Sequence, residues 1–212
     1  MKLSSLLTTL AIGACLSGGG LYANSVTIST QFFTSPDPYG HSAGEIVANT
    51  SDNGTFVTFC LENTVPISRG TAYTYTIDPG VLSIVKPLSK GTAWLYDSFL
   101  NGTLLDYLGA GSYADANHTV DADLLQEAIW ALQGQTVSPL IISSDYYYLL
   151  AQSAFGGNAL DNYTGDTIKV LTPWGPDRTD VQSLLIRVPD GGTSALLLGL
   201  GLISLALFRR KQ

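Results

Sequence analysis

The chain has 212 residues, a formal net charge of −7, two histidines and two cysteines. Between residues 24 and 187 there are six Lys and Arg against sixteen Asp and Glu, a formal charge of −10, so neither nucleic acid nor an anionic membrane surface is expected as a partner. The histidines and carboxylates lack metal-ligand spacing, and the sequence therefore predicts no metal and no cofactor.

The first 23 residues have the layout of a secretory signal peptide. Lys2 supplies a positive charge, an apolar run over 6–12 follows, and three glycines over 18–20 precede a cleavage point expected after Ala23. An alternative interpretation makes Cys15 the lipidated first residue of the mature chain. Either interpretation predicts export.

Residues 24–187 predict one strand-rich α+β domain with inserted helices. Asn53-Gly54 is a strong hairpin signal. Alternation of β-branched and polar residues, and short runs rich in β-branched and aromatic residues, predict strands over 26–33, 45–48, 55–61, 71–77, 167–171 and 181–188.

Helical spacing of apolar residues appears in the middle of the domain. It predicts helices over 92–100, with a continuation over 104–108, over 121–133 and over 145–155. Asp121 and Asp123 are expected at the positive N-terminal end of the central helix, and Gly134 is expected to terminate it.

The last 25 residues form three consecutive parts. A short motif over 188–192 precedes an uncharged apolar segment over 193–208, and a basic tail over 209–212 follows. The apolar segment predicts a short transmembrane helix, and its cationic end predicts a cytoplasmic tail. The motif residues are Val188, Pro189, Asp190, Gly191 and Gly192, and the stop-transfer residues are Arg209, Arg210 and Lys211.

These three parts resemble the PEP-CTERM class of sorting signals, and most of all the variant that begins Val-Pro-Asp-Ser-Gly. Gly191 stands where that variant has Ser. The resemblance implies a Gram-negative host in which an exosortase processes the chain during transient anchoring in the inner membrane. It also implies a final location at the cell surface or in the extracellular matrix.

Two further motifs lie within the domain. Phe59-Cys60-Leu61 ends a predicted strand, and Gln126-Glu127-Ala128-Ile129-Trp130 lies on the predicted central helix. Together they resemble the thioester domain of Gram-positive surface adhesins, in which a strand cysteine faces a helix bearing Gln-x-Ala-aliphatic-Trp.

The resemblance implies an internal thioester between the Cys60 sulfur and the Gln126 side-chain carbonyl. An amine on a partner would attack this bond and become attached through an amide. Leu125 departs from the family pattern, which has Thr before the glutamine, and this departure bears on reactivity. The candidate shielding residues are Phe59, Tyr73, Tyr75, Trp94, Ala128 and Trp130.

Two alternatives remain open at this stage. In the first, Cys60 is an inert core residue and Gln126 is satisfied by backbone partners, in a noncovalent structural protein of the matrix with the same fold. The second and remote alternative is a serine esterase, because Gly40-His41-Ser42-Ala43-Gly44 matches the nucleophile-elbow pattern with His118 downstream. Pro36 and Pro38 precede this match and a predicted strand follows it, which favours a loop.

The sequence thus predicts an exported, exosortase-processed surface or matrix protein that is not an enzyme. Its expected partners are the exosortase, the membrane during transit, and an amine-bearing surface ligand or an extracellular polysaccharide.

Overall fold

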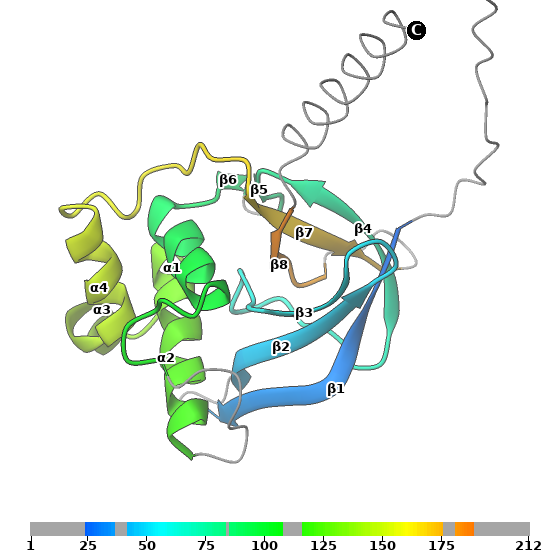
Figure 1. Ribbon diagram of the computed structural model, residues 1–212, viewed down its shortest axis with the longest axis horizontal. Helices are drawn as coiled ribbons and strands as arrows, with labels where there is room; N and C mark the ends of the chain where they lie inside the picture. Colours follow the sequence, from blue (N-terminus) through cyan, green and yellow to red (C-terminus); the bar gives the residue numbers. More distant parts are fainter. Residues whose placement is uncertain (1–23, 37–41, 84, 108–115, 176–180, 189–212) are drawn as a thin grey trace, which may run out of the picture.

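The computed structural model describes residues 24–36, 42–83, 85–107, 116–175 and 181–188 (Figure 1). They form strands and helices in the order β1 (Ser25–Pro36), β2 (Ser42–Thr50), β3 (Gly54–Thr58), β4 (Ala72–Asp78), β5 (Gly80–Val81), β6 (Lys86–Pro87), α1 (Lys90–Leu100), α2 (Ala116–Leu132), α3 (Pro139–Ser144), α4 (Tyr146–Ala154), β7 (Ile168–Trp174) and β8 (Leu184–Arg187).

The main sheet is antiparallel and curls until its two ends meet. Its six strands lie in the order β3-β2-β1-β4-β7-β8. The segment after β3 then pairs with the start of β8, because Leu61 N–H donates to Ser183 O at 3.0 Å and Leu185 N–H donates to Phe59 O at 3.2 Å. These bonds form a seam that joins the edge strands, so neither edge is left open there.

Two apolar cores follow from the alternation of side chains along the strands. The sheet core lies between the strands and includes Val26, Ile28, Ile46, Tyr73, Tyr75, Leu171, Leu184 and Ile186. The helix-side core lies where the helices pack on the sheet and includes Phe59, Leu61, Leu95, Tyr96, Leu125, Ile129, Leu132, Val170 and Leu185. Adjacent residues at the seam therefore face different cores.

The helices gather on one side of the curled sheet, with α1 and α2 next to the sheet and α3 and α4 on the outer side of these two helices (Figure 1). Gly134, at φ +72°, ends α2 as expected. Gly134 N–H donates to Ala131 O and Gln135 N–H donates to Trp130 O, which is the Schellman arrangement that satisfies the last carbonyls of a helix.

The predicted α+β class and most strands agree with the structure. Gly54, at φ +73°, turns the β2–β3 hairpin. The strand predicted over 55–61 is interrupted: β3 ends at Thr58, and Cys60 returns as an isolated bridge to Leu184. The strand predicted over 181–188 forms only over Leu184–Arg187. The two-residue strands β5 and β6 are too short to produce an alternating pattern.

Two expectations about the helices were wrong. No helix continues over residues 104–107, because Asn101 caps α1 and Gly102 follows at φ +64°. The central helix starts at Ala116, so Asp121 and Asp123 lie inside it and not at its N-terminal end. The pattern also did not predict α3, the short helix that ends at Ser144, just before α4.

Asp145 is the N-cap of α4, and its carboxylate accepts a hydrogen bond from Tyr148 N at 2.7 Å. The side chain is buried, and this burial raises the pKa of Asp145 from 3.8 to about 7, although the hydrogen bonds from Tyr147 and Tyr148 oppose the change and the charge of Asp123 adds to it. A folded-state pKa above the unfolded one means that the folded protein binds the proton more tightly.

We expect Asp145 to make the protein less stable as pH rises from about 4 to about 7, by up to about 4 kcal/mol, since each pKa unit corresponds to about 1.4 kcal/mol. Asp145→Asn keeps an oxygen acceptor for the cap but has no charge to bury. Urea unfolding at pH 4 and pH 8 measures the difference. The variant's stability should change less between these pH values than the parent's, and parallel changes in both proteins would contradict the assignment.

No helix among the described residues has the length and apolar character needed to cross a bilayer. The expected signal peptide over 1–23, the motif residues after Val188, the apolar segment over 193–208 and the basic tail all lie outside those residues.

Candidate functional site

Cys60 lies on the seam of the curled sheet. Its antiparallel bridge to Leu184 is flanked by the Leu61–Ser183 and Phe59–Leu185 hydrogen bonds, so the Cys60 N–H and C=O face away from β8. Its half-buried side chain packs against the sheet core, whereas Phe59 and Leu61 belong to the helix-side core. The backbone edge of Cys60 is therefore available to α2.

Gln126 on α2 occupies that edge. Cys60 N–H donates to Gln126 Oε1 at 2.8 Å, and Gln126 Nε2 donates to Cys60 O at 2.7 Å. The side-chain amide pairs with Cys60 as a residue of a neighbouring strand would. Gln126 is 1% exposed, so this pairing satisfies an amide that would otherwise be buried without partners. The structure thus brings together the two residues predicted to react.

The same face of α2 carries two other buried polar residues, His118 and Gln133. Gln133 Oε1 accepts a hydrogen bond from Ser89 N at 2.8 Å, in the manner of Gln126 with Cys60. His118, Gln126 and Gln133 are spaced by eight and seven residues, which places them along one stripe of a helix. This polar stripe fixes α2 against the strands and loops at its start, middle and end.

Glu45 on β2 is the partner of His118, the first residue of the polar stripe. His118 Nε2 lies 2.9 Å from Glu45 Oε1, and the Tyr107 hydroxyl donates to the same oxygen. Glu45 and His118 are both 0% exposed. Tyr107 also packs edge-on against the His118 ring. A buried carboxylate with two partners strongly favours one position of α2 relative to β2.

The thiol of Cys60 is in an environment that opposes its ionisation. Burial raises the pKa of the Cys60 thiol, and the negative charge of Glu62 raises it further. Glu62 is itself buried and held in place, because its Oε2 accepts from Ser183 N at 2.7 Å and the Ser83 hydroxyl donates to its Oε1. The site therefore disfavours a thiolate and favours an uncharged sulfur.

This arrangement has a definite chemical capability. The Cys60 N–H polarises the Gln126 carbonyl and would stabilise negative charge on Oε1 in a tetrahedral intermediate. The Cys60 carbonyl holds Nε2, the nitrogen that would depart. In a thioester the Sγ–Cδ bond replaces the Cδ–Nε2 bond, and the thiol proton leaves with the nitrogen as ammonia. Because the site disfavours a thiolate, it would also slow release of the sulfur.

The candidate shielding residues lie in different parts of the structure. Phe59 is fully buried and meets Tyr96 and Phe99 edge-on. Ala128 is fully buried in the helix-side core, and Trp130 is 4% exposed on α2. Tyr73 and Tyr75 belong to the sheet core, against which Cys60 packs. The Trp94 ring packs edge-on against Phe155, at 6.2 Å between centroids, on the α4 side of the helix-side core.

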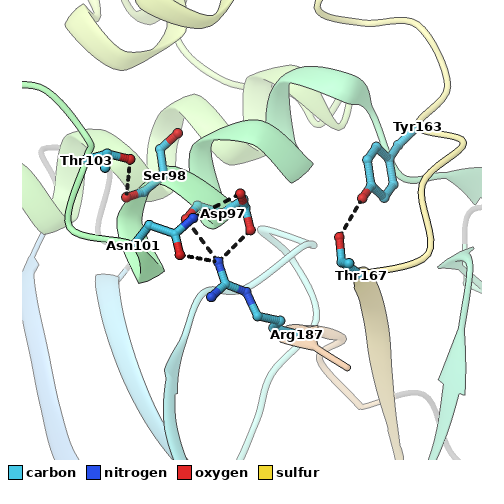
Figure 2. A network of polar contacts seen from close by, with 7 residues as sticks. All are labelled: Asp97, Ser98, Asn101, Thr103, Tyr163, Thr167 and Arg187. Atoms are coloured by element: carbon cyan, nitrogen blue, oxygen red, sulfur yellow. Dashed lines mark hydrogen bonds and ion pairs between the residues drawn. The ribbon is translucent and has the colours of Figure 1, made fainter. Parts of the chain in front are cut away.

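The domain is joined to its C-terminal motif without a linker. Arg187, the last residue of β8, donates to Asp97 O at 3.2 Å and to Asn101 Oδ1 at 3.1 Å, and it pairs with the Asp97 carboxylate (Figure 2). Val188 N–H donates to Thr167 O at 2.8 Å. The residue that begins the Val-Pro-Asp sequence is therefore still bonded to the sheet.

The residues of the esterase alternative are not arranged as an elbow. Ser42 opens β2 opposite Pro36, so a strand and not a helix follows it. Gly40 and His41 lie outside the described residues, and His118 contacts Glu45. Among the described residues there is no cluster of three or more His, Cys, Asp or Glu that would hold a metal ion.

Sequence reasoning missed Glu45, Glu62 and Gln133. Each is a single polar residue whose partners lie far away in the chain, so no local pattern marks it. Gln133 had a weak signal, because it shares a predicted helix face with Gln126.

Comparisons with known proteins found a sequence motif and a structural neighbour. Residues 187–211 match the VPDSG-CTERM motif, which confirms the predicted sorting signal. A solved structure, the N-terminal thioester domain of a surface protein from Clostridium perfringens, is similar over 76% of this chain and 97% of that chain, with 17% identity and a TM-score of 0.40. No curated protein matches the chain. The sorting motif points to an exported protein held transiently at the membrane.

Proposed function

We propose that this exported protein is a surface or matrix adhesin that attaches covalently to an amine-bearing partner through a Cys60–Gln126 thioester. An exosortase would process its sorting signal during export and release the domain to the cell surface or extracellular matrix. The protein performs one attachment and no turnover, so it is not an enzyme.

The main support for this proposal is the pair of hydrogen bonds between the Gln126 amide and the backbone of Cys60, 2.8 Å from Cys60 N to Oε1 and 2.7 Å from Nε2 to Cys60 O. It holds the carbonyl to be attacked next to the residue that bears the sulfur, which lowers the entropic cost of bond formation. When a partner amine attacks Cδ, the Cδ–S bond breaks, an amide forms, and the amine proton passes to the sulfur. Burial of Gln126 limits hydrolysis by water.

Labelling with a biotinylated primary amine tests the proposal. We expect the purified full chain to carry biotin after denaturation, whereas Cys60→Ala and Gln126→Ala should carry none. Cys15 is not a confounder in the comparison, since both variants retain it. Equal labelling of parent and variants would show that the amine reacts elsewhere and would contradict the proposal.

A second candidate function rests on the same contacts. Because the Gln126 amide is fully satisfied by Cys60 and burial raises the pKa of the thiol, the pair also suits a permanent structural link between α2 and the seam. The protein would then be a noncovalent structural component of the matrix. It predicts an unlabelled parent and a Cys60 thiol that reacts with thiol reagents after unfolding.

A further inference from the structure

A hollow of about 620 Å³, lined by polar residues, opens beyond the end of α2. It is lined by residues from the segment that follows Cys60, from β6, and from the turn after α2: Asn63, Thr64, Lys86, Gln133, Gly134, Gln135 and Thr136. We call it the Lys86 hollow. All its side chains are amides, hydroxyls or the one ammonium group.

Two hydrogen-bond donors of this hollow have no acceptor among the described residues. Gln133 is 0% exposed, and its Nε2 makes no hydrogen bond, although its Oε1 is engaged by Ser89 N. Lys86 Nζ makes neither a hydrogen bond nor an ion pair within the described part of the chain, and partial burial lowers the pKa of this amine. A buried donor without an acceptor is costly, so the Gln133 amide requires an explanation, and the partly buried Lys86 ammonium lines the same hollow.

Capping of α2 does not supply that explanation. A cation at a helix C-terminus is favourable, but the last carbonyls of α2 already accept hydrogen bonds from Gly134 N and Gln135 N. Lys86 Nζ lies close over Gly134, where a Cβ would come within 2.6 Å of it. The ammonium thus occupies a place that only glycine leaves open, without a partner there.

The backbone before Lys86 is also unusual. Val85 has φ +49°, a conformation that is costly for a β-branched residue, and its side chain is 89% exposed. Burial of Val85 therefore does not compensate the strain.

We propose that the Lys86 hollow binds a carboxylated sugar, a hexuronate unit of an acidic saccharide. The carboxylate would accept from Lys86 Nζ and Gln133 Nε2, the two donors that lack acceptors. The ring hydroxyls would meet the amide and hydroxyl side chains of Asn63, Gln135 and Thr136, which provide both donors and acceptors. A sugar acid fits this lining better than an acidic peptide, because the ring hydroxyls of the sugar can form hydrogen bonds with all of these side chains.

The hollow lies close to the candidate reactive pair. Gln133 follows Gln126 by seven residues, or about 10 Å along a helix at about 1.5 Å per residue. The inference does not depend on the thioester, since Cys60→Ala leaves every residue of the hollow in place. Failure of one proposal is thus distinguishable from failure of the other.

Calorimetric titration of the purified full chain with sodium D-glucuronate tests the inference. We expect saturable binding of D-glucuronate and none of D-glucose, which has the same ring without the carboxylate. Cys60→Ala should bind as the parent does. Absence of saturable binding, equal binding of glucose, or tighter binding of N-acetyl-L-glutamate would overturn the assignment.

Variants locate the site. Lys86→Met keeps the aliphatic stem without the charge and should weaken binding at least about tenfold, whereas Lys86→Arg should retain most of it. Gln133→Glu keeps an oxygen for Ser89 N but replaces the second donor with a carboxylate, so it should abolish binding. Lys90→Met is the matched control, because Lys90 pairs with Asp161 on the surface and should not matter. Unchanged affinity in Lys86→Met would contradict the proposal.

Discussion

The intact mass of the purified chain is expected to fall short of the mass calculated from its residues by one ammonia. This deficit follows from the proposed chemistry, because the Sγ–Cδ bond between Cys60 and Gln126 forms only if Nε2 departs. Addition of methylamine should replace the deficit with the mass of one methylamine adduct. The thiol of Cys60 should then become titratable, although burial will slow its reaction.

Three variants separate the bond from other causes of a mass change. Cys60→Ser and Gln126→Glu should each have full calculated mass and form no adduct. Gln152→Ala serves as the matched control, because Gln152 is also a helical glutamine but lies on α4, where its amide donates to the Tyr148 hydroxyl. It should keep the deficit. Full mass in the parent, with no adduct, would refute the covalent proposal and leave the structural candidate.

Most of the fold could be predicted because its strands alternate in a local pattern. Val26 and Ile28 point to one core and their neighbours do not, which a period of two reveals directly. The closure of the sheet could not be predicted in this way. It depends on the Cys60–Leu184 bridge, which joins distant residues and has no local signature. The isolated bridge also explains why the predicted strand over 55–61 is broken.

The helix errors have a similar cause. Asp121 and Asp123 are typical first-turn residues, yet α2 already includes His118, which is buried against Glu45. A lone histidine and a lone glutamate give no pattern in a sequence. Tertiary context of this kind routinely overrides local propensity.

The two main residues of the candidate site could be predicted from the sequence, but the way they contact each other could not. Resemblance identified Cys60 and Gln126, but it did not indicate that both amide atoms of Gln126 bond to the Cys60 backbone. It also did not indicate Glu62, whose charge raises the pKa of the thiol. The polar stripe of α2 links these observations, because one register places His118 on Glu45, Gln126 on Cys60 and Gln133 on Ser89.

Glu45→Ala is expected to lower the free energy of unfolding by about 3 to 5 kcal/mol, the usual cost of removing one partner from a buried pair. His118 would lose its ion-pair partner and the Tyr107 hydroxyl its acceptor, while both residues stay buried or partly buried. Because the contact sets the register of α2, we also expect amine labelling at Gln126 to decrease. Urea denaturation monitored by circular dichroism measures the stability, and biotin transfer measures the labelling.

Glu45→Gln keeps one oxygen acceptor in the same place and should cost less than Glu45→Ala, about 1 to 3 kcal/mol. It also keeps the test meaningful if the alanine variant does not fold, since a loss of about 5 kcal/mol can exhaust the stability of a domain. Asp161→Ala is the control, because its pair with Lys90 is exposed and should be worth less than about 1 kcal/mol. If Glu45→Ala is no more costly than Asp161→Ala, then the buried contact does not hold α2 in register, and the position of Gln126 must depend on its own pairing with Cys60.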